Sequence, residues 1–482
     1  GFFPAAAVGW RISEEPFMLE AKDKIAMSNL KMRLSYGQAG NNRIASGMFE
    51  TLYKAYSSSK YYGAGNILNP HYTLSNAQLA NPNLKWETTT TRNLGLDFGF
   101  FNERLNGNID LYWNSTADLL IKSKINAMGY TEVQENVAET SNKGIEISLN
   151  GNILQKKNYS LNVNFNIGFN RNRVEKLKNG ITSQEYNSGG FSTDLKEQDD
   201  YRVIVGEPLG IIYGFVSDGY YSVDDFETYV DGNGTTQFKM NNGNYVLKEG
   251  VANNAYTAGS VAGLRPGSIK LKDLDNSGTI DAKDRQIIGR TAPKHTGGFG
   301  INGTVYGFDI SATFNWVYGN QVYNLDKIAT TQTYRTTYAN MRDYMSSNNR
   351  FTYLDRATGE IVTDYATLKA MNEGKEYWSP LSIGDNSPIV TSWAVEDGSY
   401  LRFQNLTVGY TLPQSWTKKF ACNQFRVYCT LNNIWTWTKY TGYDPEVNSS
   451  IRSSSTSGLT PGADFSSYPK SFSWTVGLNL SF

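Results

Sequence analysis

The chain has 482 residues, of which 45 are Lys or Arg and 45 are Asp or Glu, so its formal charge is zero. This balance argues against a nucleic-acid-binding protein, which normally carries a basic face. Hydrophobic residues make up only 39% of the chain, its mean hydropathy is −0.46, and no apolar run is long enough for a transmembrane helix.

Alternation with a period of two recurs along the chain. In the clearest case Leu161, Val163 and Phe165 alternate with Asn162 and Asn164. Successive side chains of a strand face opposite sides, so such a strand has one apolar face and one polar face. The pattern predicts about eleven spanning strands, at 2–13, 30–39, 85–101, 105–122, 142–155, 159–177, 295–306, 308–323, 399–412, 424–439 and 471–482.

Asparagine at every second position of a whole strand is unusual in a soluble sandwich but natural beside a water-filled lumen. The last strand has an apolar face and a face of small and polar residues, and it ends on the aromatic Phe482. In the strand 399–412, Leu401 and Phe403 have the opposite parity to Leu406 and Val408. We expect a β-bulge there, because one extra residue switches the face.

The connections alternate between short and long. Short turns are expected at 102–104, 156–158 and 307, and long polar stretches at 40–84, 124–140, 178–294, 324–398 and 440–470. This asymmetry is typical of outer-membrane barrels, whose turns are short on the periplasmic side and long outside the cell. The predicted fold class is therefore all-β, a transmembrane antiparallel β-barrel with long extracellular loops.

Eleven strands leave two open sheet edges, and unpaired backbone groups in lipid cost several kcal/mol each. No signal peptide is recognisable at Gly1, where the chain opens in the middle of an alternating pattern. We therefore expect residues 1–482 to be the C-terminal part of a longer barrel protein.

Several segments resemble one known family. They are 81–87 (NPNLKWE), 205–210 (VGEPLG), 213–219 (YGFVSDG), 395–413 (VEDGSYLRFQNLTVGYTLP), 432–433 (NN) and 443–446 (YDPE). Together they resemble SusC/RagA-like TonB-dependent outer-membrane transporters. The resemblance implies a 22-stranded barrel with a plugged lumen. This chain would supply strands 12 to 22, and the plug domain and N-terminal strands would be absent from it.

The resemblance also implies a function and partners. These are active import of a nutrient across the outer membrane of a Gram-negative, Bacteroidota-like bacterium, with an oligosaccharide or glycan favoured over a peptide as the ligand. Expected partners are a SusD-like surface lipoprotein, the TonB complex through the missing N-terminal region, and outer-membrane lipid. Two alternatives stay open: a passive porin, and a surface glycan-binding or adhesin barrel.

The excursion 178–294 contains a motif of alternating oxygen-bearing side chains. Residues 273–284 match a twelve-residue EF-hand-like loop with Gly278 at its sixth position. The predicted ligands are Asp273, Asp275, Ser277, Thr279, Asp281 and Asp284. We expect a bound cation with a structural role. Asp284 stands where such loops usually have Glu, so the choice between Ca²⁺ and Mg²⁺ stays open. The alternative is a solvated acidic turn.

No catalytic constellation is evident, so we expect no enzyme activity. His71 and His295 are the only histidines, and nothing near either suggests a nucleophile partner. Aromatic residues in the long loops are better candidates, because rings exposed at a pore mouth could stack on sugars. The candidates for substrate binding are Tyr61, Tyr62, Tyr220, Tyr221, Trp378 and Trp393. The alternative is that these rings pack the loops together or contact the lipoprotein.

Overall fold

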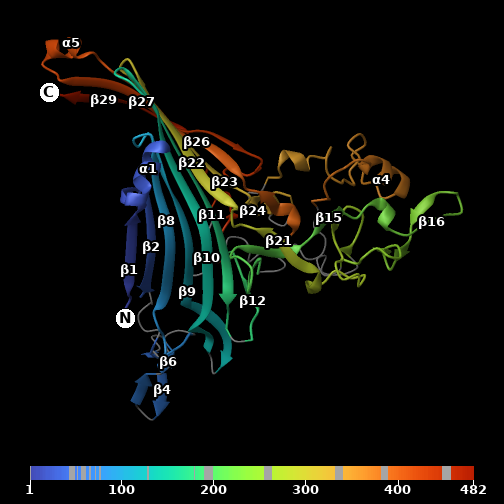
Figure 1. Ribbon diagram of the computed structural model, residues 1–482. Helices are drawn as coiled ribbons and strands as arrows, with labels where there is room; N and C mark the ends of the chain where they lie inside the picture. Colours follow the sequence, from blue (N-terminus) through green and yellow to red (C-terminus); the bar gives the residue numbers. More distant parts are fainter. Residues whose placement is uncertain are drawn as a thin grey trace.

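The computed structural model describes residues 2–42, 49–50, 53–55, 61–64, 67–70, 72–74, 78–127, 130–178, 180–188, 199–254, 263–331, 340–380, 389–447 and 458–482. One large curved sheet dominates this part of the chain (Figure 1). Eleven long strands pair antiparallel in chain order, as expected for a barrel wall. They are β1 (Ala5–Arg11), β2 (Met27–Asn41), β8 (Glu87–Phe100), β9 (Leu105–Ala127), β10 (Tyr130–Gln155), β11 (Tyr159–Lys176), β22 (His295–Val305), β23 (Phe308–Tyr318), β26 (Tyr400–Thr411), β27 (Gln424–Thr438) and β29 (Ser473–Ser481).

Each predicted strand corresponds to one of these eleven, but one predicted connection is wrong. We expected a long loop over 124–140, whereas β9 and β10 continue as a hairpin through Ala127 and Tyr130. The positions that pair in the backbone ladder there include 122 and 134, both polar in the sequence. Because successive residues are polar here, the sequence shows no alternation of apolar and polar residues, although the backbone hydrogen bonds continue. The short β7 (Gln78–Leu79) joins this extension in parallel.

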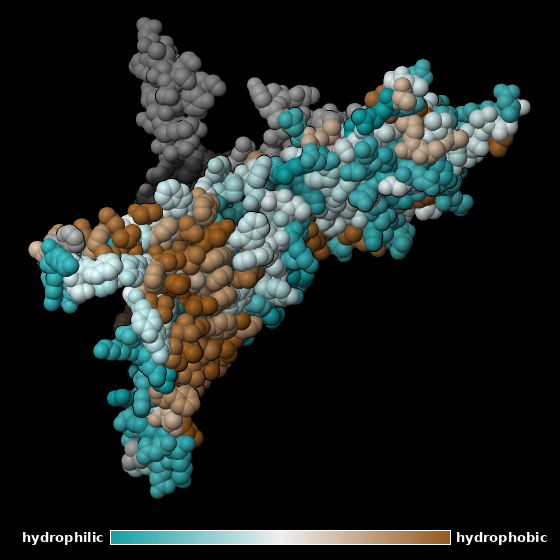
Figure 2. Space-filling model, turned by 90° about the horizontal axis from the view of Figure 1, so that it is seen from above, coloured by the Kyte–Doolittle hydropathy of each residue, from teal (hydrophilic) through white to brown (hydrophobic). Residues whose placement is uncertain are grey.

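The register places apolar side chains in continuous rows across one face. Leu34 lies opposite Leu94, Leu94 opposite Leu111, Leu111 opposite Ile145, and Ile145 opposite Phe169. Figure 2 shows the resulting band of hydrophobic side chains over the sheet. At its far end Trp474 is 67% exposed. Large exposed apolar side chains in rows indicate a lipid-facing surface, which we call the outer belt.

The predicted β-bulge is confirmed. Thr313 pairs with Asn405 and Phe314 with Phe403, so Gln404 is left without an opposite residue. The switch places Phe403 on the same face as Leu406. The ring of Phe314 consequently stacks between Phe299 and Phe403, with centroids 4.5 Å and 4.4 Å away. The bulge therefore keeps the outer belt continuous across β26.

The opposite face of the sheet, the lumen face, is polar. Arg33 spans neighbouring strands and contacts Asp97 at 2.8 Å and Asp110 at 3.0 Å. Gly95 makes room for it, because a Cβ there would lie 2.5 Å from the guanidinium carbon. Arg426 and Asp309 form a similar pair over Gly409, at 2.5 Å. Ion pairs laid over glycines thus cross-link the wall without filling the lumen.

The remaining elements lie in the connections between the long strands. The strands are β3 (Tyr53–Ala55), β4 (Tyr61–Ala64), β5 (Ile67–Pro70), β6 (Tyr72–Leu74), β12 (Ser183–Tyr186), β13 (Tyr201–Ile204), β14 (Ile211–Phe215), β15 (Ser217–Tyr220), β16 (Thr228–Val230), β17 (Thr236–Phe238), β18 (Met240–Asn241), β19 (Asn244–Tyr245), β20 (Ile269–Leu271), β21 (Arg285–Arg290), β24 (Gln321–Asn324), β25 (Val395–Asp397) and β28 (Ala463–Asp464). The helices are α1 (Pro16–Lys24), α3 (Leu325–Ala329), α4 (Tyr365–Asn372) and α5 (Gln414–Thr417).

Three long connections fold together into one body. We call the described parts of 178–294, 324–398 and 440–470 the loop assembly, which projects from the sheet in Figure 1. Its inner sheet places β24 between β25 and β28, so the two ends of the 324–398 connection pair with each other and with the 440–470 connection. A buried core that includes Tyr201, Ile212, Tyr323, Val390 and Ala463 lies beneath. These loops are thus packed structure of their own.

The inner core also encloses a carboxyl group. Asp200 is fully buried, and Ser188 donates to it from its backbone N at 2.8 Å and from its Oγ at 2.5 Å. Burial disfavours the charged form and raises the pKa of this carboxyl to about 7. The folded protein therefore holds a proton there at pH values where an unfolded chain has released it.

The lipid-facing character of the outer belt can be tested with a matched pair of substitutions, because neighbouring residues of β10 face opposite sides of the sheet. Ile147 lies in the belt opposite Ile109 and Ile167, whereas Ser148 lies on the lumen face. We expect Ile147→Arg to lower the free energy of unfolding in lipid vesicles by about 2–4 kcal/mol, the cost of a cation at the bilayer midplane. Ser148→Arg should change it far less. Equal losses in denaturant titrations would contradict a lipid-facing belt.

The buried carboxyl predicts a pH dependence. The pKa of Asp200 rises from its ordinary 3.8 to about 7 on folding, so the unfolded state binds fewer protons between these pH values. The stability contributed by Asp200 is therefore complete below pH 3.8 and is lost as pH rises through about 7. We expect the melting temperature of Asp200→Asn to fall less than that of the wild type between pH 5 and 8. Asp199→Asn, at the less buried neighbouring position, serves as the control, and parallel melting curves for all three proteins would refute the assignment.

Candidate cation-binding loop and ligand-binding residues

The predicted cation loop connects β20 to β21 on the loop assembly. Carboxylate oxygens of Asp273, Asp275 and Asp284 lie within 4.8 Å of one another, which brings together the first, third and twelfth positions of the motif. The other predicted ligands have backbone partners here. Ser277 Oγ donates to the Thr279 carbonyl at 2.9 Å, and Asp281 Oδ1 accepts from Lys283 N at 2.7 Å.

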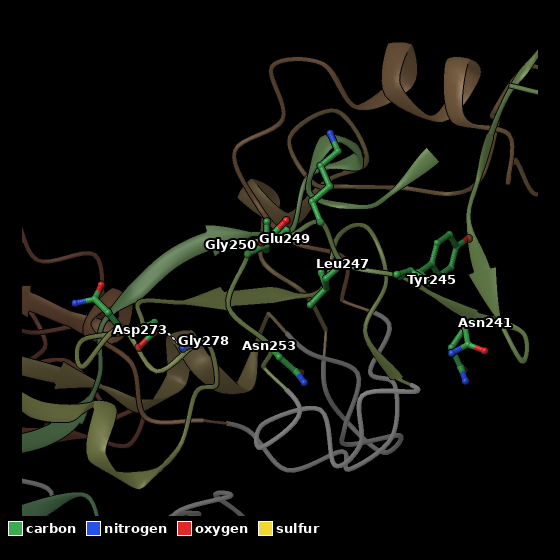
Figure 3. Close-up of a pocket in the computed structure, with 13 residues that line it drawn as sticks. Asn241, Tyr245, Leu247, Glu249, Gly250, Asn253, Asp273 and Gly278 are labelled. Carbon is green, nitrogen blue, oxygen red and sulfur yellow. Dashed lines mark hydrogen bonds between the residues drawn. The ribbon is translucent and has the colours of Figure 1, made fainter. Parts of the chain in front are cut away.

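The turn is shaped by its own carboxylates. Asp273 accepts from the backbone N of Ser277 at 3.1 Å and of Gly278 at 2.7 Å, the latter drawn in Figure 3. Gly278 has φ +78°, a conformation that glycine adopts without strain. Asp284 is fully buried and accepts from Leu274 N and Asp281 N, at 2.7 and 2.8 Å. The backbone thus aims three carboxylates at one point.

This geometry fits a hard cation. Ca²⁺ and Mg²⁺ prefer clustered oxygen ligands, and the glycine in sixth position produces the sharp turn that such loops need. Hydrogen bonds from Ser277 lower the pKa of Asp275 below its ordinary value, which keeps that carboxylate charged. Three like charges this close repel one another unless a cation compensates them.

The loop is anchored to the rest of the assembly. Ile280 is fully buried and packs in a core with Phe215, Leu271 and Ile389. The backbone of Asn253 bonds to both sides of the turn, through Gly278 O at 2.8 Å and Ile280 N at 2.9 Å. A change in the turn is therefore transmitted to the segment around Asn253.

The aromatic candidates lie mostly inside the loop assembly, and the expectation of exposed rings is wrong for two of them. Tyr221 is fully buried, and its hydroxyl donates to Ala252 O at 2.6 Å. Trp378 is 4% exposed, with its ring 4.6 Å from that of Trp393. These rings fill the core between two long connections, since burying a large ring stabilises a loop that has little regular structure. They are closed to a ligand in this conformation.

Two further aromatic candidates, Tyr220 and Trp393, are only partly buried. The ring of Tyr220 packs edge-on against Phe351, and its hydroxyl donates to Lys375 O at 3.0 Å. Trp393 lies beneath the ammonium group of Lys327, 4.1 Å from the ring centroid. Tyr61 and Tyr62 belong to β4, and their side chains lie outside the described residues. Ligand contact by these four residues stays a prediction.

Sequence reasoning missed a buried ionic cluster at the loop end of β26. Arg402 is 2% exposed and contacts Asp444 at 2.5 Å and Glu446 at 2.8 Å. Its Nε also donates to Thr436 Oγ1 at 3.0 Å. The cluster ties the start of the 440–470 connection to the barrel wall. The Asp-Pro-Glu segment and the arginine were both noticed in the sequence, but nothing local indicated that they meet.

His295 packs among aromatic side chains of the barrel wall. Its Nδ1 accepts a hydrogen bond from Trp316 Nε1 at 3.0 Å, and its ring stacks on Tyr318 with centroids 4.9 Å apart. His71 lies outside the described residues. Among the helices that are described, none has the length and apolar character needed to cross a bilayer.

Comparison with known proteins identifies the family. Residues 1–262, more than half of the chain, match the family described as "TonB dependent receptor-like, beta-barrel". Over its whole length the chain is 30% identical to TonB-dependent receptor P3 of Formosa agariphila and 27% identical to TonB-dependent receptor SusC of Bacteroides thetaiotaomicron. It spans 42% and 40% of these two relatives, so it corresponds to less than half of such a protein.

Solved structures support the same fold. The RagAB peptide importer in its "closed-closed" state superposes over the whole chain with a TM-score of 0.69 at 21% identity, and the chain covers 44% of it. A second RagAB structure, described as a peptide transporter, gives 0.67 at 23% identity. At these identities the likeness concerns the fold alone.

The comparisons confirm the predicted resemblance to SusC and RagA, the antiparallel barrel fold and a location in the outer membrane. The family consists of receptors and transporters rather than enzymes, as expected. The chain belongs to the TonB-dependent receptor-like β-barrel family and corresponds to the C-terminal part of such a receptor.

Proposed function

We propose that this chain supplies half of the barrel wall and the loop assembly of a TonB-dependent importer for an oligosaccharide. The observation that supports this most strongly is the combination of an outer belt, a polar lumen face and a packed loop assembly at the end with the long connections. A pore wall with a built structure at its mouth suits capture and passage of a hydrophilic solute. A plain porin wall needs no such structure.

The proposed partners follow from membership in the TonB-dependent receptor-like family. A SusD-like surface lipoprotein would cover the loop assembly, and the TonB complex would supply energy through the part of the receptor that precedes these residues. RagAB is named as a peptide importer, so a peptide is the second candidate ligand. The relatives named SusC and P3 leave the ligand class of this chain open.

The experiment that tests this function is uptake by intact cells. Cells that express the complete receptor should accumulate one radiolabelled oligosaccharide, and deletion of the receptor should abolish that uptake. A protonophore should stop it as well, because import through TonB requires the inner-membrane proton gradient. Uptake that continues with the protonophore would favour the passive porin. Loss of peptide uptake alone would favour the peptide, and unchanged uptake of both classes would favour the adhesin.

We also propose that residues 273–284 bind Ca²⁺ or Mg²⁺. Asp273, Asp275 and Asp284 would supply the carboxylates. Ser277, Asp281 and the Thr279 carbonyl would complete the set of oxygen ligands after small rotations. The role would be structural, since a bound cation offsets the repulsion of the three carboxylates and fixes a turn that holds Ile280 in its core.

The cation proposal predicts a chelator effect. EDTA should lower the melting temperature of the purified receptor and speed proteolysis within 273–284, and Ca²⁺ or Mg²⁺ should reverse both changes. The double variant Asp273→Asn, Asp275→Asn should abolish the response. Asp231→Asn is a matched control, because Asp231 caps another acidic turn through Asn233 N and Thr235 N, both at 2.9 Å. A receptor that holds no metal by elemental analysis and ignores EDTA would refute the site.

A further inference from the structure

The loop assembly contains an open cavity beside the turn 273–278. It has a volume of about 820 Å³ and lies between the segment 241–253 and the turn 273–278. Figure 3 shows the residues that surround it, including Asn241, Tyr245, Asn253 and Asp273. The volume falls within the range of about 300–1,000 Å³ that is typical of small-molecule sites.

The first wall of this cavity is held by a hydrophobic core. The ring of Tyr245 packs edge-on against Phe226 and Phe238, with centroids 5.6 and 5.0 Å away. Backbone bonds continue the support, since Lys248 N donates to Asp225 O at 2.9 Å. The cavity wall is therefore fixed from behind, and its polar edge is presented outward.

The second wall is the turn that Asp273 shapes through the backbone of Ser277 and Gly278. Asn276 sits at its tip, exposed and with φ +56°. The two walls are joined by the hydrogen bond from Asn253 N to Gly278 O, at 2.8 Å. Because the walls are bonded to each other, the cavity is largely formed before a ligand arrives, which lowers the entropic cost of binding.

The chemistry of the lining favours a neutral polyol. Four primary amides line the cavity, and each offers both hydrogen-bond donors and an acceptor. They belong to Asn241, Asn244, Asn253 and Asn276. Sugar hydroxyl groups also donate and accept, so neighbouring hydroxyls match such amides. The charged lining residues, Lys248, Glu249 and Asp273, sum to only one negative charge, which gives a polyanion or a polycation little advantage.

We propose that this cavity is a binding subsite for a short neutral oligosaccharide. The inference deepens the proposed import function and rests on it, since the cavity lies on the loop assembly at the barrel mouth. Asn241 lies on one wall and Asn276 on the other, and their amides would bind ring hydroxyls, while Glu249 would accept from a further hydroxyl. The sugar therefore bridges the segment 241–253 and the turn 273–278.

The test uses the complete receptor in detergent. It is first screened on an array of neutral oligosaccharides of about four to eight sugar units and, in parallel, on a peptide array. Affinity for the best sugar is then measured by calorimetry for the double variant Asn241→Ala, Asn276→Gly. Glycine is chosen at 276 because it accepts a positive φ without strain. Asn348→Ala, an exposed asparagine that does not line the cavity, is the matched control.

We expect the double variant to bind about tenfold more weakly, which corresponds to the loss of two amide contacts. Its melting temperature should match that of the control. A sugar bound equally well by wild type and double variant would overturn the subsite and leave oligosaccharide import intact. A receptor that binds peptides but no sugar would overturn both the subsite and the oligosaccharide part of the proposed function.

Discussion

The structure depends on one constraint: no backbone polar group can remain unpaired where the chain contacts lipid. The long strands satisfy this by pairing each with the next in chain order, from β1 to β29. Because side chains alternate, a slip of one residue would turn every apolar side chain inward. The rows that run from Leu34 to Phe169 show that the register is kept across successive strands. The bulge at Gln404 restores the register in β26, whose sequence changes parity.

The lumen face meets a different demand, because it must stay polar and still hold the wall together. Arg33 and Arg426 do this by lying flat over Gly95 and Gly409, where a side chain would collide with them. Arg33 on β2 pairs with Asp97 on the adjacent β8 and with Asp110 on β9, the strand beyond it. Arg426 on β27 reaches across β26 to Asp309 on β23. At the loop end, Arg402 performs a related task in a buried setting, joining β26 to the 440–470 connection through Asp444.

The sequence predicted the barrel wall well and the loop assembly poorly, for a physical reason. A strand in a membrane repeats a local pattern every two residues, so all eleven strands and the bulge could be read from neighbouring positions. The contact of Arg402 with Asp444 joins residues 42 positions apart, and the burial of Tyr221 and Trp378 depends on how separate connections pack. No local period encodes such contacts. The twelve-residue spacing of 273–284 is an exception, because the motif itself is local.

The loop assembly packs in two layers, each around a hydrophobic core of its own. In the inner layer β24 pairs with both β25 and β28, so a change in the 324–398 connection disturbs the 440–470 connection as well. The outer layer, with the β16–β17 hairpin and α4, rests on a separate core around Phe226 and Leu368. Because the two cores have no residue in common, a change inside the outer core should leave the inner core and the barrel wall in place.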